Sequence, residues 1–353
     1  MKILLIVHRF HPNLYYPVKS LIEYGHQVQM LVPKVDIYDN LIEDHAYVKP
    51  IKLIDNELSI SNITKIINQL KPDLIIQRHF KDKWKWFSIV GQIKGIKCIA
   101  YDQSPQIGHS FLKQKLRPIR RFLRGEPLKK FTPVLHKGIP EKYAEPFSTY
   151  IPFPIEPIIN DITKKKYSPN ETIRFLCVGK LGQKRKNHIL LLTALEAINS
   201  NCSLTFAGAG PDFYYSDKEY FEELKKRSEN SSIKGGVKIL MDLPHTKMLN
   251  IYKEHDVLVM PSEKEAHGQA ILEGLAAGCP VIATDDCGAA SYITDGYNGF
   301  IFKKNDLNGL IEKLNIFIND PLKIPEFGHN AIQQIIKQHS PESFVKNILD
   351  IVL

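Results

Sequence analysis

The N-terminal half of the chain alternates short apolar runs with segments of helical spacing. The runs KILLIV, HQVQMLVP, PDLIIQ and IKCIAY are typical of buried strands, and the segments YPVKSLIEYG and WKWFSIVGQIKG between them are typical of helices. Strands that alternate with helices predict a parallel sheet with crossover helices.

From Ile173 the same alternation begins again. Strands are expected at IRFLCVG, CSLTFAG, VKIL, HDVLVMPS, PVIAT and GFIF, with helices over about 188–199 and 214–228 and from Gly268. This series predicts a complete doubly wound unit of its own. We therefore expect an α/β fold of two Rossmann-like domains, each with a doubly wound parallel sheet.

The proline-rich segment STYIPFPIEPIIN suits an ordered linker between the two units. It predicts an N-terminal domain over residues 1–155 and a C-terminal domain over residues 156–335. Residues 336–353 carry apolar side chains at helical spacing, from Phe344 to Val352, which predicts a final helix that packs back across the domains.

A length of 353 residues with 43% hydrophobic residues is too long for one compact core and sufficient for two. The net charge of +9 is uneven, because residues 1–150 carry 24 Lys and Arg against 13 Asp and Glu, whereas residues 151–353 carry 23 against 25. The first half is therefore expected to attract an anionic partner, whether a phosphate-bearing substrate, a membrane surface or nucleic acid.

The five cysteines are scattered singly, without metal-ligand spacing, so we expect a reducing compartment and no metal site. The first apolar run, Ile3 to Val7, is too short for a secretion signal. No run approaches the length of roughly 18 apolar residues that a membrane-spanning helix needs. These features predict a cytoplasmic protein.

The stretch FLKQKLRPIRRFLRGEPLKKF, residues 111–131, contains eight basic residues and one acidic residue. Apolar residues recur at helical spacing from Leu112 to Leu123, and Pro118 is expected to kink such a helix. A basic amphipathic segment can lie on the anionic cytoplasmic face of a membrane or hold a lipid-linked phosphate. A solvated surface helix whose apolar stripe belongs to the core explains the same pattern.

Candidate chemistry is concentrated in PSEKEAHGQAILEGLAAGCPVIAT, residues 261–284. Residues 268–270 are expected to open a helix whose first-turn N–H groups face the carboxyl edge of the sheet and form an anion site. Glu265 lies in the loop before that turn, and Glu273 lies inside the helix on a face directed to the same cleft. Such a pocket suits a diphosphate flanked by sugars, because carboxylates accept hydrogen bonds from sugar hydroxyls.

A second candidate loop lies in CVGKLGQKRKNHILLLTAL, where a strand ends, Gly179 permits a turn and a helix follows. Lys180 and Lys186 bracket this loop, and two ammonium groups at that edge can neutralise a diphosphate. Asn187 is expected to cap the following helix. Lys184 and Arg185 are expected to be solvated.

These two stretches resemble the retaining glycosyltransferase family 4, the group 1 glycosyl transferases, whose fold is called GT-B. Glu265 and Glu273 show the family's spacing of two glutamates, within its flanking pattern from Pro261 to Thr284. The stretches TFAGAGPD and EHDVLVMPS resemble the family's glycine-rich turn and the strand that leads to the glutamate motif. The resemblance covers most of residues 172–303 and is fainter before them.

The resemblance implies a role for each of these residues. Glu273 would bind the ribose of the nucleotide, and Glu265 would contact donor-sugar hydroxyls or the junction of the phosphate and the sugar. Lys180 and Lys186 would stabilise the departing nucleoside diphosphate, although Lys180 stands where the family has arginine and lacks its bidentate geometry. Further donor contacts are implied for the backbone of the two turns, at Gly179 and at Gly268, Gln269 and Ala270. A donor contact is also implied for His267, which stands where the family often has an aromatic residue.

By this resemblance the chain transfers a sugar from a nucleoside diphosphate to an acceptor hydroxyl, with retention at the anomeric carbon. No cofactor is implied and no Asp-x-Asp metal signature is present, so we expect a metal-independent hexosyltransferase. The family association is with polysaccharide, lipopolysaccharide or glycolipid biosynthesis, on a glycan or lipid-linked acceptor. A sugar phosphorylase or epimerase of this architecture and a non-catalytic GT-B-like binding protein remain alternatives. Nucleic acid is not expected, because the basic segment lacks interleaved aromatic residues.

Polar residues that follow the predicted strands of the first domain are candidates for the acceptor side, because open α/β sheets bind ligands there. Asp102 sits near a position that often carries a catalytic histidine or aspartate in the family, so a catalytic role is predicted for it. The glycine pair that the family has after its first strand is absent from HRFHPNLYYP. The remaining candidates, each with a structural hydrogen bond as the alternative, are His8, Arg9, His11 and His79.

Overall fold

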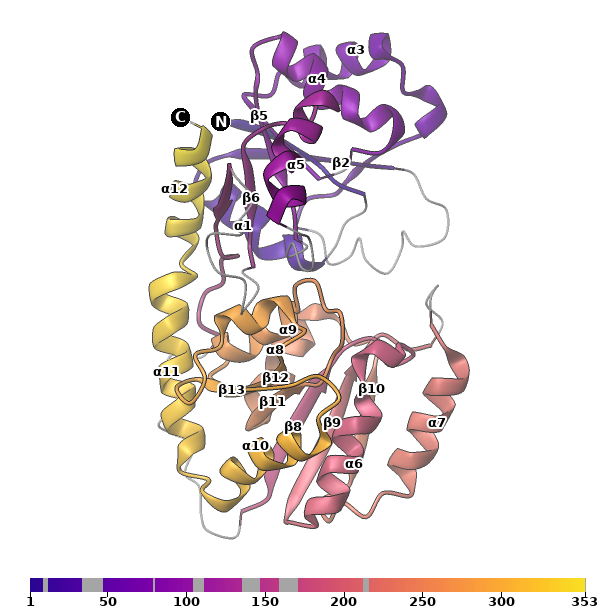
Figure 1. Cartoon of the computed structure of the whole chain (residues 1–353), viewed down its shortest axis with the longest axis vertical. Coiled ribbons are helices and arrows are strands. Elements are labelled where there is room, and N and C mark those ends of the chain that lie inside the picture. Colours follow the sequence, from indigo (N-terminus) through magenta and orange to yellow (C-terminus); the bar gives the residue numbers. More distant parts are fainter. Residues whose placement is uncertain are drawn as a thin grey trace. The chain divides into compact units, whose positions relative to one another are not determined.

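The computed structural model describes residues 1–8, 12–33, 47–78, 80–103, 111–134, 147–158, 171–211 and 216–352 (Figure 1). The chain divides into two compact units. The N-terminal unit comprises Met1–Pro154 with His339–Leu353, and the C-terminal unit comprises Ile155–Gln338. Each unit has its own parallel sheet with helices. The predicted α/β fold of two parallel-sheet units is therefore confirmed.

The sheet of the N-terminal unit consists of parallel strands wherever the structure describes it. Its strands are β1 (Lys2–Ile6), β2 (Gln27–Pro33), β3 (Ile51–Leu53), β4 (Leu74–Gln77), β5 (Lys97–Tyr101), β6 (Lys130–Thr132) and β7 (Ser148–Tyr150). They lie in the order β3-β2-β1-β4-β5-β6-β7. Because the order reverses at β1, loops after β1 and β4 diverge and leave room for a ligand at the carboxyl edge.

Helices cover the N-terminal sheet in two groups. They are α1 (Tyr15–Glu23), α3 (Ile60–Leu70), α4 (Trp86–Ile93), α5 (Phe111–Leu123) and α12 (Pro341–Val352), with short 3-10 helices η1 (Pro12–Leu14), η2 (Asp55–Glu57) and η3 (Asp82–Lys85). Helix α3 packs against α4, whereas α1 packs against α12, which also reaches β5. The Trp84 side chain is buried in the core, and its indole N–H donates to the Asp55 carboxylate at 2.7 Å.

The sheet of the C-terminal unit is also parallel in its described strands. These are β8 (Ile173–Val178), β9 (Cys202–Gly208), β10 (Val237–Met241), β11 (Val257–Met260), β12 (Val281–Thr284) and β13 (Gly299–Phe302). Their order is β10-β9-β8-β11-β12-β13, so the reversal falls between β8 and β11. Strands β11 and β12 are buried along their whole length, as expected for strands covered on both faces.

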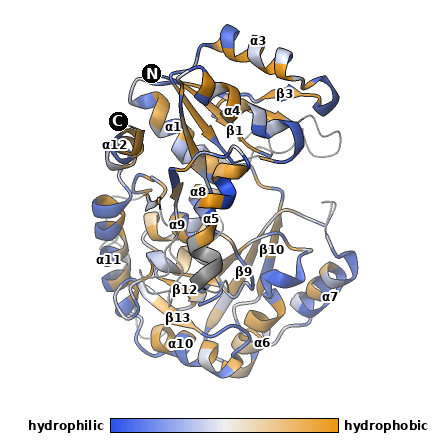
Figure 2. Ribbon diagram, turned by 45° about the horizontal axis from the view of Figure 1, so that its top comes forward, coloured by the Kyte–Doolittle hydropathy of each residue, from blue (hydrophilic) through white to orange (hydrophobic). Residues whose placement is uncertain are grey.

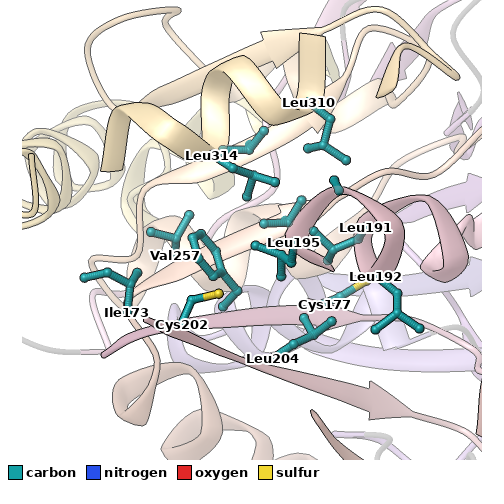
Figure 3. Close-up of a cluster of buried hydrophobic side chains, with 14 of the residues drawn as sticks. Ile173, Cys177, Leu191, Leu192, Leu195, Cys202, Leu204, Val257, Leu310 and Leu314 are labelled. Carbon is teal, nitrogen blue, oxygen red and sulfur yellow. The ribbon is translucent and has the colours of Figure 1, made fainter. Parts of the chain in front are cut away.

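The helices of the C-terminal unit are α6 (His188–Ile198), α7 (Lys218–Glu229), α8 (His245–Glu254), α9 (Gln269–Ala276), α10 (Leu307–Asn319) and α11 (Lys323–Gln338), with η5 (Lys184–Lys186) and η6 (Gly288–Tyr292). Helix α6 packs against α10, and α9 packs against α8 and α11. Figure 3 shows Leu191 and Leu195 of α6 and Leu314 of α10 converging on Ile173 and Val257 of the sheet. Figure 2 shows the outer helix α7 with many hydrophilic positions, in contrast to the hydrophobic strand β12.

Two local expectations differ from the structure. Helix α7 begins at Lys218 and not at 214, because the Asp217 side chain accepts a hydrogen bond from the Tyr220 N–H and caps the helix there. Asn187 occupies the N-cap position of α6 in a left-handed conformation, but its amide donates to Asn305 and makes no cap bond. Helix α5 includes Pro118 within its bounds.

Candidate functional site

Loops that follow β8, β9 and β11 meet at the carboxyl edge of the C-terminal sheet. Strands β8 and β11 are neighbours at the point where the strand order reverses. The loop after β8 carries Lys180 and Lys186, and the loop after β11 carries Glu265. In open α/β sheets the crevice at such a reversal is the usual place for a ligand.

Two glycines allow the loops after β8 and β9 to approach each other closely. A Cβ on Gly208 would lie 1.7 Å from the carbonyl oxygen of Gly179, a backbone atom that cannot move aside cheaply. A Cβ on Gly179 would lie 3.1 Å from Cδ of Lys186, so the lysine stem runs across the bare glycine. Glycine at both positions therefore lets Lys186 reach across the edge of the sheet.

Lys186 and Arg185 both donate to the same carboxylate oxygen, Oε2 of Glu265, and the Arg185 bond measures 2.9 Å. The Glu265 side chain is only 13% exposed. Burial raises the pKa of Glu265, but the charges and hydrogen bonds of Lys186 and Arg185 outweigh burial and lower the pKa to about 2. Glu265 is therefore ionised at neutral pH and can only accept hydrogen bonds.

Backbone hydrogen bonds fix the position of the Glu265 loop. Glu265 forms a parallel bridge with Cys287, and its carbonyl accepts from the Gly288 N–H at 2.8 Å. The Glu263 N–H donates to the carbonyl of Arg185 at 2.7 Å. The loops after β8 and β11 are thus joined through their backbones as well as through the ion pair, so the charged cluster is held before any ligand binds.

The turn into α9 depends on glycine. Gly268 is the N-cap residue and has φ of +88°, a left-handed conformation that residues with a Cβ rarely adopt. A Cβ there would also lie 2.8 Å from Sγ of Cys287. The N–H groups of Gln269 and Ala270 have no carbonyl partner earlier in the helix, whereas the Ile271 N–H donates to the Gly268 carbonyl at 2.9 Å. Sequence and structure therefore agree that a helix starts at this edge of the sheet.

Two side chains near the start of α9 are largely buried. The His267 ring is 1% exposed and packs edge-on against Tyr292, with centroids 6.0 Å apart. Both amide atoms of Gln269 are buried, and among the described residues they have no hydrogen-bond partner. A buried amide without a partner is costly, so a polar ligand group beside Gln269 would gain two hydrogen bonds.

Glu273 lies one turn further along α9 than Gln269, and it is 7% exposed. The Tyr252 hydroxyl of α8 donates to its Oε2 at 2.9 Å. Tyr252 itself is fully buried. Helix α8 thus orients the Glu273 side chain through Tyr252, and the sequence pattern did not indicate this contact.

The basic loop contains one contact that the sequence analysis did not predict. Lys184 is exposed and pairs with Asp217 at 3.0 Å, outside the charged cluster. Arg185 is exposed, as expected, but its guanidinium also donates to Glu265. The short helix η5 turns consecutive basic side chains in different directions, and sequence spacing alone does not show which one faces the sheet.

In the N-terminal unit, Asp102 follows β5, and its carboxylate lies 3.7 Å from the ammonium of Lys130 on β6. Both residues line a cavity of about 450 Å³ at the carboxyl edge of the sheet, together with His8 and Arg78. The structure therefore brings two of the predicted acceptor-side residues, His8 and Asp102, to one cavity. The other predicted candidates lie outside the described residues, namely Arg9, His11 and His79.

Within the ranges that the structure describes, no helix is long and apolar enough to cross a membrane. The same ranges contain no cluster of three or more His, Cys, Asp or Glu side chains suited to a metal ion. All five cysteines belong to these ranges, and each is a free thiol.

Comparison with known proteins gives consistent matches. The family model described as "Glycosyl transferases group 1" matches residues 159–338. The chain is 31% identical over 129 residues to an uncharacterised glycosyltransferase of Methanocaldococcus jannaschii, covering 36% of each chain. It is 24% identical over 197 residues to the poly(glycerol-phosphate) alpha-glucosyltransferase of Bacillus subtilis, covering 55% of this chain and 27% of that protein. The chain thus matches only about a third or less of the length of these two relatives.

Similarity to solved structures extends over the whole chain. Anabaena HepE in complex with UDP and glucose superposes with a TM-score of 0.74 at 16% identity, covering 99% of this chain and 98% of that one. At this identity the likeness establishes the fold. With the family match over half of the sequence, it shows that the chain belongs to the group 1 glycosyl transferases and has the GT-B fold.

Proposed function

We propose that this protein is a retaining glycosyltransferase that moves a sugar from a nucleoside diphosphate to an acceptor hydroxyl. The observation that carries the proposal is the charged cluster at the carboxyl edge of the C-terminal sheet, where Lys186 and Arg185 flank an ionised Glu265. Cations beside a hydrogen-bond acceptor suit a ligand that has both phosphate oxygens and sugar hydroxyls.

The donor would lie across the start of α9. Lys180, Lys186 and the first N–H groups of α9 would hold the diphosphate, and Glu265 would accept hydrogen bonds from the sugar. Glu273, held by Tyr252, would bind the nucleotide ribose. HepE, which has the same fold, was solved with UDP and glucose, and this supports a nucleotide-sugar donor.

The proposed reaction requires little covalent help from the protein. The acceptor oxygen forms a bond to the anomeric carbon on the face from which the diphosphate leaves. The bond from that carbon to the β-phosphate oxygen breaks, and the hydroxyl proton passes to an oxygen of the departing nucleoside diphosphate. Lys186 and Lys180 stabilise the negative charge that develops on the leaving diphosphate. Glu265 stays ionised because of its low pKa, so it positions the sugar and does not act as an acid.

We further propose that the enzyme needs neither a cofactor nor a metal ion. The charge that a divalent cation would supply at a diphosphate is supplied here by the two lysines and by the start of α9. Activity that persists in EDTA would support this part of the proposal, and activity restored only by added Mg²⁺ or Mn²⁺ would refute it.

For the acceptor we propose a glycan or a lipid-linked saccharide in cell-surface polymer synthesis. Relatives named as a capsular polysaccharide biosynthesis glycosyltransferase of Staphylococcus aureus and as the Bacillus subtilis enzyme support this class. Peripheral contact with the cytoplasmic face of a membrane is part of the proposal, because α5 exposes Ile119, Phe122 and Leu123 beside its arginines. Flotation with anionic liposomes tests it, and protein that stays at the bottom of the gradient refutes it.

The central experiment is calorimetric titration of the wild type with UDP, GDP, ADP and their sugars, without metal. One nucleotide should bind, and Glu273→Ala should weaken its binding by at least about tenfold, the effect of losing a charge-assisted hydrogen bond. Lys184→Ala serves as the control, because Lys184 lies in the same loop but outside the cluster. Failure of every nucleotide to bind would refute the proposal. NMR of the product would then test retention of the anomeric configuration.

A further inference from the structure

The cavity of the N-terminal unit lies where a ligand of an α/β sheet is expected. Its wall is formed by His8 after β1, Arg78 after β4 and Asp102 after β5, and by Lys130 on β6. Helix α5 and the turn after it close one side with arginines. The volume of about 450 Å³ is typical of a small-molecule site and exceeds what a single inorganic anion fills.

The charge of this cavity is strongly unbalanced. Its lining contains six Arg and Lys side chains but only two carboxylates, Asp102 and Glu126. Both carboxylates already face cations, because Asp102 lies 3.7 Å from Lys130 and Glu126 lies 3.9 Å from Arg121. Arg121 also donates to the Leu128 carbonyl at 2.9 Å and therefore has a structural role.

Three guanidinium groups of the lining have no carboxylate partner among the residues that the structure describes: Arg78, Arg120 and Arg124. Arg78 donates to the neutral amide oxygen of Gln103 at 2.8 Å and lies over the Tyr101 ring, 5.6 Å from its centroid. Arg120 and Arg124 are one helical turn apart, and the Arg124 N–H donates to the Arg120 carbonyl at 3.2 Å. Both side chains are exposed, so they can reach a ligand without losing an existing ion pair.

Arginine forks match the oxygens of a phosphate group, which they bind through two parallel hydrogen bonds. A phosphate dianion would also compensate more of the excess positive charge than a single carboxylate does. The ring of Tyr101 is only 2% exposed and stacks on Phe131 at 4.9 Å, so it belongs to the cavity wall and supports the Arg78 guanidinium that lies over it. Asp102, on the same wall, is placed to accept a hydrogen bond from a hydroxyl.

We infer that the acceptor of this enzyme carries a phosphate group, which Arg78, Arg120 and Arg124 bind in this cavity. The inference rests on the proposed transferase function and names the class of its acceptor. The phosphate fixes the acceptor at the carboxyl edge of the N-terminal sheet, and a hydroxyl of the same molecule is the nucleophile. An acceptor of this kind is a phosphorylated polyol or sugar, either free or as the head group of a lipid.

Binding of defined probes by the intact chain tests this inference separately from sugar transfer. Glycerol 3-phosphate and glycerol are titrated into the wild type, into Arg120→Ala/Arg124→Ala and into the control Lys94→Ala/Lys97→Ala. The control removes the same charge from exposed positions of the same unit that lie outside the cavity. Circular dichroism verifies that the variants fold, as expected for substitutions of exposed side chains.

Glycerol 3-phosphate should bind the wild type and the control alike, and glycerol should not bind. The arginine variant should bind the phosphate at least about tenfold more weakly, since two charge-assisted contacts are lost. Equal binding of glycerol and glycerol 3-phosphate, or equal binding by the arginine variant and the control, overturns the inference. Nucleotide affinity, measured in parallel, should be the same in all three proteins. If no nucleotide binds while the phosphate result holds, the transferase function fails and the anion site stands.

Vesicles distinguish the source of the phosphate. The chain is sedimented with phosphatidylcholine vesicles that contain or lack phosphatidylglycerol, in the presence and absence of glycerol 3-phosphate. Binding to the anionic vesicles that glycerol 3-phosphate displaces indicates a lipid head group in the cavity and supports the inference. Anionic vesicles that bind without displacement, while the soluble phosphate does not bind at all, show that the arginines serve a membrane surface and overturn it.

Discussion

The two sheets present charged sites at equivalent edges, but the charges are arranged in opposite ways. At the edge of the C-terminal sheet, Lys186 and Arg185 close on Glu265, a carboxylate of low exposure. At the edge of the N-terminal sheet, Arg120 and Arg124 extend into a cavity without carboxylate partners among the described residues. In the first site both cations are already paired with a carboxylate before a ligand arrives, and in the second the described residues give these arginines no such partner.

This difference indicates what each edge recognises. A cluster whose cations are already paired in a fixed geometry is suited to holding a reacting group in one position, since its charges need no rearrangement during the reaction. An unbalanced, exposed set of arginines attracts an anion and gives affinity more than geometry. We therefore expect substitutions at the C-terminal edge to affect the rate of transfer, and substitutions at the N-terminal edge to affect acceptor binding.

The largest expected effect is at Lys186. Lys186→Ala removes a cation from the leaving diphosphate and leaves Glu265 with Arg185 as its remaining charged partner. We expect the rate of transfer at saturating substrates to fall by about 100- to 1000-fold, the range seen when one electrostatic donor is removed. Steady-state kinetics with the donor identified by calorimetry measures this.

Lys184→Ala is the matched control for this substitution, because Lys184 belongs to the same 3-10 helix and pairs with Asp217 instead. Its rate should stay within about twofold of the wild type, as for most surface changes. Equal losses in the two variants would show that the loop contributes only general positive charge. The proposed difference between Lys186, which is held by Glu265, and the exposed Lys184 would then be refuted.

The next effect is on the backbone that supports the C-terminal edge. In Gly208→Ala the new methyl group would lie 1.7 Å from the Gly179 carbonyl oxygen, so the loops after β8 and β9 must separate. We expect the free energy of unfolding to fall by about 1–3 kcal/mol, together with nucleotide affinity. Urea denaturation and calorimetry measure the two quantities.

Gly210→Ala, two residues further on, gives the comparison for Gly208. Its Cβ would lie 3.0 Å from Oδ2 of Asp242, a side-chain atom that can rotate away. The loss of stability should therefore be smaller than in Gly208→Ala. A larger loss at Gly210 than at Gly208 would contradict the close approach of the two loops.

Much of the fold and part of the C-terminal site followed from the sequence. Fully buried parallel strands are continuous apolar runs, so VLVM and VIAT were recognisable as strands, and the glutamate spacing located Glu265. The contact of Arg185 with Glu265 was missed because Arg185 stays exposed and meets Glu265 only where the loops after β8 and β11 join. The Asp217 cap was a readable signal, since an aspartate directly before a helical segment is a common N-cap.

The arginine cavity shows what sequence patterns cannot supply. Arg78 and Arg120 lie far apart in the chain, and they share a cavity only because β4, β5 and α5 meet at one edge. Periodicity identified α5 as basic and amphipathic but did not show that its arginines line a cavity behind Asp102. Such long-range juxtaposition depends on the strand order, which the chain alone left undetermined.

Acid should destabilise the C-terminal site through His188, which directly follows the basic loop. Burial, together with the smaller effect of the Lys186 charge, lowers the pKa of His188 to about 3. The unfolded chain has a His pKa near 6.5, so it binds more protons than the folded chain between these values. The contribution of His188 to the free energy of unfolding is therefore fully present above about pH 6.5. Below that pH it falls by at most about 1.4 kcal/mol per pH unit.

Urea denaturation at several pH values between 7 and 5 measures this slope, with His188→Asn as the comparison. The variant is expected to be less stable at every pH, because the buried ring packs on Phe206, but its pH slope should be smaller. Glu265 does not contribute to the pH dependence of stability in this range. Its ion pairs stabilise the folded chain above about pH 4.5, and this stabilisation is lost only as pH falls from about 4.5 toward 2. An unchanged slope in the variant would assign the acid sensitivity to another group.

The smallest expected effect separates the two edges by ionic strength. The arginines of the N-terminal cavity are exposed, whereas Lys186 and Glu265 have side chains only 11% and 13% exposed. Salt screens the interactions of exposed charges increasingly with distance, over a Debye length of about 8–10 Å, and it screens buried pairs much less. Raising KCl across the physiological range should therefore weaken glycerol 3-phosphate binding by about threefold while nucleotide binding changes less. Equal salt dependence at both edges would mean that the C-terminal cluster opens to solvent when it binds its ligand. The buried contact of Lys186 with Glu265 would then describe only the ligand-free protein.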